Sequence, residues 1–125
     1  MIVWVDGWQM QCCGEPFAVG AAVSWELVGP DREWLTSVLG AQTAAVVDGA
    51  EERHGRTDGR PVHARVASVE VVHCRFAAKP GAEGLWPVAG SGVRTAVTSV
   101  DGREGAEDGL EFVGYLVGLA DPAGG

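Results

Sequence analysis

Thiol and imidazole side chains are the groups in this sequence best suited to bind a metal ion. Cys12 and Cys13 are adjacent, His73 and Cys74 form a second adjacent pair, and His54 lies between the two pairs. Tetrahedral zinc takes sulfur and nitrogen ligands of these kinds. Neighbouring residues of a regular strand point to opposite faces, so we expect only one of His73 and Cys74 to contribute. Zinc is therefore a candidate cofactor, although the sequence has no C-x-x-C or H-x-x-x-H spacing to support it.

The same cysteines allow a second chemistry, nucleophilic catalysis. Cys13 precedes a glycine in a segment expected to be a loop, and the imidazole of His54 would activate its thiol if the two met in space. Glu51 or Glu52 would then orient the imidazole. No known cysteine-enzyme signature surrounds Cys13, so a role without catalysis is favoured. The alternative for all three cysteines is burial as small apolar side chains.

Tryptophan is frequent for a chain of this length, with five in 125 residues. Trp4, Trp25 and Trp34 fall within apolar patterns, which indicates that they belong to the core. Trp8 and Trp86 fall beside glycine, glutamine and proline in expected loops, where an exposed tryptophan is a typical anchor of a protein interface. The alternative is that Trp8 and Trp86 cap the open ends of a barrel.

Basic residues are concentrated in one part of an acidic chain. The net charge is −8, which disfavours general binding to polyanions or to an anionic membrane surface. Residues 53–79 nevertheless carry six basic and two acidic residues, a local charge of +4, and the remainder carries −12. This segment is a candidate site for an anionic ligand or a single nucleic-acid strand, through Arg53, Arg56, Arg65 and Arg75. The alternative is that these arginines pair with carboxylates of the acidic remainder.

The remaining polar groups have no marked catalytic arrangement. We expect Asp6, Glu15, Glu51 and Glu52 to be solvated surface carboxylates, since no pair of them is set apart for acid–base work. The glycine-rich segment 90–92 lacks the spacing and the lysine of a phosphate-binding loop, so it predicts a tight connection before a strand.

The elements that would position these groups are mostly short strands. Residues 17–27 alternate between apolar and polar side chains, and residues 111–119 are apolar on both faces, which predicts a central strand. The apolar phase changes twice within residues 62–76, which predicts bulges or a sharp bend. Residues 31–40 have the N-cap and spacing of one short helix. Residues 43–48 are expected to form a further strand.

About six strands and one helix, without a β-α-β rhythm, predict a mainly β fold. The expected architecture is a small antiparallel β-barrel or curled sheet, of the size of SH3 and OB domains. Residues 8–16 have no clean period and predict a loop. We expect residues 1–120 to form a single globular domain and residues 121–125 to be a frayed tail.

The N-terminus has no feature of a secretory signal, and no segment approaches the roughly 18 apolar residues that span a bilayer. Three cysteines, two of them adjacent, also form a poor disulfide framework. We therefore expect a soluble, cytoplasmic protein that does not enter a membrane.

Four segments of the chain resemble a family of small, uncharacterised proteins from GC-rich bacteria. They are VWVDGWQMQCCGEPFAVGAAVSW near the N-terminus, EERHG at 51–55, HCRFA at 73–77 and FVGYLVGL at 112–119. The resemblance covers most of the chain and implies a self-standing domain of unknown function. It implies no catalytic residues, because the family has no established activity.

These observations favour a non-enzymatic small β-barrel that acts as an interaction or accessory module with a protein partner. One alternative is a zinc-binding domain that uses cysteine and histidine. The other is a binder of anionic ligands or single-stranded nucleic acid through residues 53–79.

Overall fold

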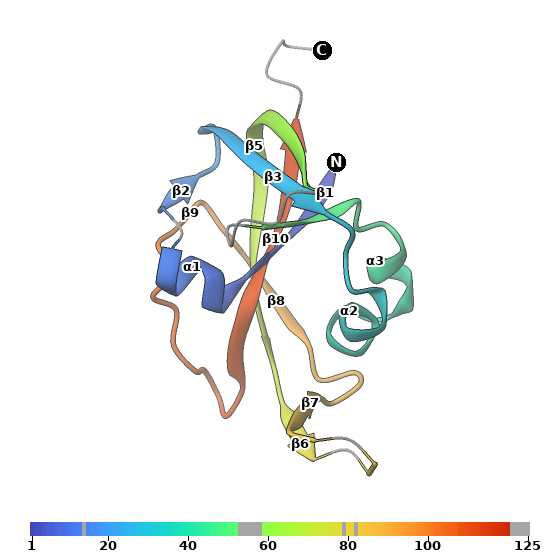
Figure 1. The fold of residues 1–125 in the computed structure, drawn as a ribbon. Helices are drawn as coiled ribbons and strands as arrows, with labels where there is room; N and C mark the ends of the chain where they lie inside the picture. The colour runs from blue at the N-terminus through green and yellow to red at the C-terminus, as the bar shows by residue number, and fades with distance from the viewer. Residues whose placement is uncertain (14, 53–58, 79, 82, 121–125) are drawn as a thin grey trace.

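A curled sheet of six strands forms the centre of the molecule (Figure 1). The computed structural model describes residues 1–13, 15–52, 59–78, 80–81 and 83–120. Within this part of the chain the elements are β1 (Ile2–Asp6), α1 (Gly7–Cys13), β2 (Phe17–Ala18), β3 (Ala22–Val28), α2 (Arg32–Leu39), α3 (Ala41–Ala45), β4 (Gly49–Glu51), β5 (Arg60–Cys74), β6 (Phe76–Ala78), β7 (Leu85–Pro87), β8 (Val93–Val97), β9 (Ser99–Val100) and β10 (Glu111–Ala120). The predicted tail, residues 121–125, lies outside the described residues.

Strand pairing in the main sheet runs in the order β10-β1-β4-β3-β5-β8, and β10 also pairs with β5. The pairing therefore returns to β10, and the sheet curls around an interior. Strand β4 pairs with β1 over two residue positions and with β3 over two, so the curl is not a regular barrel. The mainly β fold and the curled sheet predicted from the sequence are confirmed.

The two phase changes predicted in β5 have different causes. The register of β5 with β10 skips Ala67, between Val66 and Ser68, and this bulge moves the inward-facing positions from even to odd residues. The second change reflects burial of both faces, because Val71 packs in one core and its neighbour Val72 in another. Only the first of the two changes is therefore a bulge of β5 itself.

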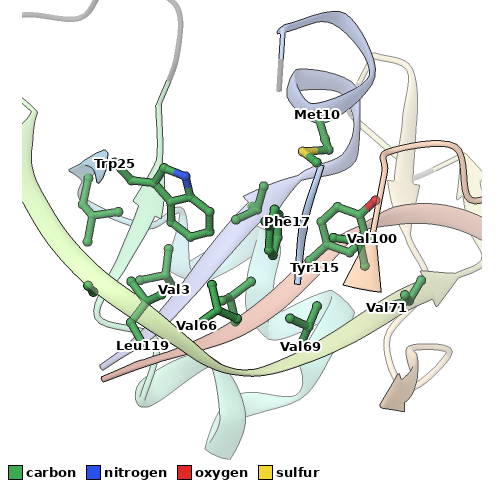
Figure 2. Close-up of a cluster of buried hydrophobic side chains, with 14 residues drawn as sticks. Val3, Met10, Phe17, Trp25, Val66, Val69, Val71, Val100, Tyr115 and Leu119 are labelled. Carbon is green, nitrogen blue, oxygen red and sulfur yellow. The ribbon is translucent and has the colours of Figure 1, made fainter. Parts of the chain in front are cut away.

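An inner core fills the curl. Figure 2 shows Met10 reaching from α1 toward Phe17 and Tyr115, so α1 closes one end of the interior. The Phe17 ring meets the Trp25 ring edge-on, with their centroids 5.2 Å apart. The buried members of the inner core are Val3, Val5, Met10, Phe17, Trp25, Leu27, Ala64, Val66, Val69, Val71, Val100, Tyr115, Val117 and Leu119.

An outer core lies on the opposite face of the sheet, where α2 and α3 cover it. Strand β10 contributes Tyr115 and Val117 to the inner core and Val113 and Leu116 to the outer one. This double burial explains why β10 is apolar on both faces, as a central strand requires. The buried members of the outer core are Trp4, Leu35, Val38, Ala44, Val47, Val72, Cys74, Val113 and Leu116.

Helix α2 forms where the sequence predicts a helix, and the Asp31 side chain caps it by accepting a hydrogen bond from the backbone N–H of Trp34 at 3.1 Å. The loop predicted for residues 8–16 is wrong in its first part, because α1 occupies Gly7–Cys13; two turns are too short to show a helical period. The strand predicted for residues 43–48 is also wrong. That segment begins in α3, which buries Ala44 in the outer core.

The length and apolar character of the helices decide whether one of them could cross a membrane. No helix in the described ranges is long and apolar enough to cross a bilayer.

Candidate functional site

Strand β1 places a tryptophan and a carboxylate on the same face of the sheet. Trp4 and Asp6 are two positions apart, so both point toward the outer face. Strand β4 runs parallel to β1 with Ala50 opposite Trp4. The same register brings Glu52, two positions after Ala50, to the side of Asp6. Residues far apart in the sequence thus meet because β1 and β4 pair.

A cavity of about 450 Å³ opens beside these residues, and we call it the acidic pocket. Its lining combines indole rings with carboxylates from β1, α1, β4 and the start of α2. In the part of the chain that the structure describes, no lysine or arginine lines it. The residues that give it this character are Trp4, Trp8, Trp34, Asp6, Asp31, Glu51 and Glu52.

The Asp6 carboxylate lies between two of the indoles. Trp4 donates a hydrogen bond from Nε1 to Oδ1 of Asp6 at 3.1 Å, and the Trp8 side chain also hydrogen-bonds to Asp6. Burial raises the pKa of Asp6 above its usual value, the two indole hydrogen bonds oppose this rise, and the negative charges of Glu52 and Asp31 add to it. The ionised form of Asp6 is therefore destabilised in this pocket, and a cation beside it would relieve that cost.

The acidic residues of the pocket differ in exposure. Asp6 and Glu52 are half-buried, and Glu51 is only 3% exposed. The expectation that these three are solvated surface carboxylates is therefore wrong, because the pairing of β1 with β4 draws them inward. Glu15 is exposed as expected. Asp31 also has a structural role. It caps α2, and its negative charge interacts favourably with the positive end of the helix dipole.

The tryptophans form the walls of the pocket. The Trp34 ring meets the buried Trp4 ring edge-on, with their centroids 5.7 Å apart. Trp8, on α1, is 57% exposed, which is what an interface anchor requires. Trp86 is half-buried on β7, opposite Ala77 in the β6–β7 hairpin, and it does not line the pocket. The structure therefore links Trp8, and not Trp86, to the acidic residues.

A second cavity of about 560 Å³ adjoins the acidic pocket, and we call it the apolar pocket. The two cavities share the side chains of Asp6, Trp8 and Trp34. The other walls come mainly from β6, β7 and β10, and α1 adds Gly7 and Gln11. One basic and one acidic residue are among them. They include Phe76, Leu85, Phe112, Val113, Arg75 and Glu111.

The predicted metal ligands are described only in part. Cys74 is fully buried in the outer core, and its neighbour His73 lies on the other face, with Nε2 3.0 Å from the carbonyl oxygen of Gly105. This confirms that His73 and Cys74 do not point together. His54 and the side chains of Cys12 and Cys13 lie outside the described residues.

Metal chemistry gains little support from the groups that can be placed. Burial, reinforced by the negative charge of Glu111, raises the pKa of the Cys74 thiol to about 11, and a protonated thiol is a poor metal ligand. Among the residues that the structure describes, no three His, Cys, Asp or Glu side chains are grouped to hold a metal ion. The zinc site stays a prediction.

The predicted basic residues are also placed in part. Arg65 is exposed on β5 and donates from Nη1 to the backbone oxygen of Gly20 at 2.5 Å. Arg75 is exposed and lines the apolar pocket. Arg53 and Arg56 lie outside the described residues. Arg65 and Arg75 therefore have different surroundings, and anion binding through residues 53–79 stays a prediction.

The glycine-rich segment 90–92 is the tight connection that the sequence predicts. Ser91 accepts a hydrogen bond from the backbone N–H of Arg75 at 3.0 Å and donates one to the backbone oxygen of Val88 at 2.7 Å. Its hydroxyl thus joins the loop to the end of β5, in a structural role.

Residues 1–121 match a protein family of unknown function, DUF6578, and the chain belongs to that family. The resemblance to a family of unknown function is thereby confirmed. No curated protein and no solved structure matches the chain significantly. What the site can do must therefore be argued from its own geometry and charge.

Proposed function

We propose that this member of the DUF6578 family is a protein-interaction module that receives a cationic side chain of its partner in the acidic pocket. The observation that carries the proposal is the lining, in which three tryptophans and four acidic residues border one cavity. Aromatic faces attract cations, and carboxylates pair with them. Arginine fits best, because its planar guanidinium stacks on an indole while its N–H groups bind a carboxylate in pairs.

The electrostatics of Asp6 support the same occupant. Its pKa is raised by burial and by the charges of Glu52 and Asp31, so the ionised carboxylate is in an unfavourable environment. A guanidinium beside Asp6 would reverse this effect and favour the ionised form. Binding of a cation would thus offset the cost of ionising Asp6, and carboxylates with shifted pKa values cluster at functional sites.

These charges also oppose an anionic ligand at Trp8. A nucleic-acid strand stacked on Trp8 would bring its phosphates toward Asp6 and Glu52, which line the same pocket as Trp8 and would repel them. If residues 53–79 bind an anion, Trp8 therefore does not contribute to that site. The zinc hypothesis uses other residues and is independent of the acidic pocket.

The test uses a short peptide, acetyl-Gly-Gly-Arg-Gly-Gly-amide, and its citrulline counterpart, which has nearly the same shape but no charge. We expect isothermal titration calorimetry at low salt to show saturable binding of the arginine peptide and at least tenfold weaker binding of the citrulline peptide. A tenfold difference corresponds to about 1.4 kcal/mol, within the range of a partly desolvated cation–π contact. Equal affinity of the two peptides would contradict the proposal.

Two tryptophan variants provide a matched pair. Trp8→Ala removes an exposed wall of the acidic pocket, whereas Trp86→Ala removes a tryptophan that does not line it. We expect Trp8→Ala to abolish measurable binding of the arginine peptide and Trp86→Ala to leave it within twofold of the wild type. Circular dichroism of both variants checks that each one is folded. Similar losses in the two folded variants would argue against the acidic pocket.

A further inference from the structure

We infer that the partner segment carries a large apolar residue two positions from its cationic residue, and that this second side chain occupies the apolar pocket. This inference rests on the proposed function for the cationic half of the segment. It adds the second half of the recognition motif, and hence the class of sequence that the module selects.

The two pockets are neighbours with common walls. Asp6, Trp8 and Trp34 line both of them, so ligand groups in the two pockets would border the same three residues. Alternate side chains of an extended peptide lie on one side of its backbone, roughly 6.6 Å apart. A segment that crosses Trp8 in an extended conformation would therefore direct residues i and i+2 into the two pockets.

The walls of the second pocket select an apolar side chain. Phe76, Leu85 and Phe112 are among the residues that line it, and Leu85 is 67% exposed. The formal charges of Arg75 and Glu111 at this pocket offset each other, which leaves the shared Asp6 as its one uncompensated charge among the residues that line it. The acidic pocket is lined by four acidic residues and by no basic residue that the structure describes. This difference in charge favours the cationic side chain in the acidic pocket and the apolar side chain in the apolar pocket.

A glycine next to the shared wall allows Phe112 to take this position. A Cβ atom added at Gly7 would lie 2.7 Å from the Phe112 ring, which is closer than van der Waals contact permits. Gly7 separates Asp6 from Trp8 in the sequence. The D-G-W sequence therefore provides the carboxylate and the indole that both pockets share, together with the space for the aromatic wall of the second.

The test compares two peptides by isothermal titration calorimetry. Acetyl-Gly-Arg-Gly-Leu-Gly-amide has leucine two positions after arginine, and acetyl-Gly-Arg-Gly-Gly-Gly-amide lacks the leucine. We expect the wild-type protein to bind the leucine peptide at least tenfold more tightly. In Leu85→Ala this advantage should fall below threefold while affinity for the peptide without leucine stays unchanged. Val93→Ala, which shortens an exposed apolar residue that lines neither pocket, is the control and should keep the full advantage.

The outcomes separate this inference from the proposed function. If neither peptide binds, the proposed function fails and this inference fails with it. Acetyl-Gly-Leu-Gly-Arg-Gly-amide tests the reverse order of the two residues. If the peptide without leucine binds and leucine improves affinity less than twofold in both orders, only the inference is overturned. Sedimentation of the free protein tests a competing occupant, because a dimer that Leu85→Ala converts to a monomer would show that a second copy of the chain covers the apolar pocket.

Discussion

The indole of Trp4 donates a hydrogen bond to the carboxylate of Asp6 at 3.1 Å, on the outer face of β1. Trp4 is only 3% exposed and belongs to the outer core, whereas Asp6 lines both pockets. One side chain therefore takes part in the packing of the sheet and in the positioning of the candidate binding group. Substitutions in the core around Trp4 should consequently alter the position of the Asp6 carboxylate.

Asp6→Asn should raise the stability of the protein and weaken its binding of the arginine peptide. The pKa of Asp6 is raised in the folded state, so the folded protein keeps this proton to higher pH than the unfolded chain does. The free energy of unfolding therefore falls as the pH rises through the usual pKa of aspartate to the raised value, and it stays lower above that window. Asparagine has no proton to lose, so we expect Asp6→Asn to unfold at a higher urea concentration at pH 7.

The same variant should lose the arginine peptide, because a neutral amide does not pair with guanidinium. Glu107→Gln is the matched control, since it removes one negative charge from an exposed residue that lines neither pocket. We expect it to change neither the urea midpoint nor peptide binding appreciably. If Asp6→Asn lowered stability at pH 7 and kept binding intact, the role assigned to Asp6 would be wrong.

The sequence predicts the framework of this protein better than its candidate site. Apolar periodicity is a local signal, so it locates β3, β5, β10 and α2 and indicates the bend at Ala67. The acidic pocket depends on the parallel pairing of β1 with β4, which no local pattern shows. From the sequence alone, Asp6 and Glu51 therefore look like surface carboxylates.

A signal for the pocket does exist in the sequence. Trp4 and Asp6 occupy alternate positions of an otherwise apolar strand, so a charged group shares a face with a core tryptophan. Trp8 then follows after a single glycine. Such a pattern indicates a carboxylate held among aromatic rings, but it does not tell which other segment completes the pocket.

Gly114→Ala should disturb both the sheet and the pocket. A Cβ atom at this position would overlap the backbone oxygen of Val5 and lie 2.6 Å from the Trp4 ring. We expect a loss of about 1–3 kcal/mol in the free energy of unfolding, as is usual for overpacking, and weaker binding of the arginine peptide because Trp4 must move. Gly105→Ala is the control, since its Cβ would meet nothing within 4 Å. Equal urea midpoints for the two variants would show that the sheet absorbs the added group.

Tyr115→Phe should loosen the connection between β9 and β10. The buried hydroxyl of Tyr115 accepts a hydrogen bond from the backbone N–H of Gly102 at 2.9 Å and donates one to the carboxylate of Glu104. Without this hydroxyl, the Gly102 N–H loses its partner. We therefore expect the free energy of unfolding, measured in urea at pH 7, to fall by about 1–3 kcal/mol. Glu104→Gln keeps an acceptor for the hydroxyl and should cost less.

The pH dependence of Tyr115→Phe provides a second measurement. Burial, with the carboxylate of Glu104, raises the pKa of Tyr115 above its usual value of 10.0. The unfolded chain therefore releases this proton first, and wild-type stability should fall as the pH rises above about 10. Phenylalanine has no such proton, so the gap in stability between variant and wild type should narrow there. A constant gap from pH 7 to pH 11 would contradict this account.

Cys74 should be protected from alkylation in the folded protein, as measured in a Cys12→Ser/Cys13→Ser background that leaves it as the single thiol. Burial and the charge of Glu111 raise its pKa from 9.0 to about 11. At pH 8 this leaves about one thiolate in a thousand, against about one in ten for a thiol at pKa 9.0. We therefore expect iodoacetamide to react at least a hundredfold more slowly with the native protein than with the protein in urea.

The alkylation rate also bears on which residues could bind zinc. A native thiol that reacts as fast as the unfolded one would show that Cys74 is accessible and ionisable, and it would return Cys74 to the candidate ligands. Slow alkylation of the native protein would count against Cys74 as a ligand, because a buried, protonated thiol binds zinc poorly. The zinc hypothesis would then depend on Cys12, Cys13, His54 and His73. Cys74→Ser should destabilise the protein by about 1–3 kcal/mol, because a hydroxyl in the outer core loses its hydration. Cys74→Ala, which removes the thiol without adding such a group, is the control for that cost.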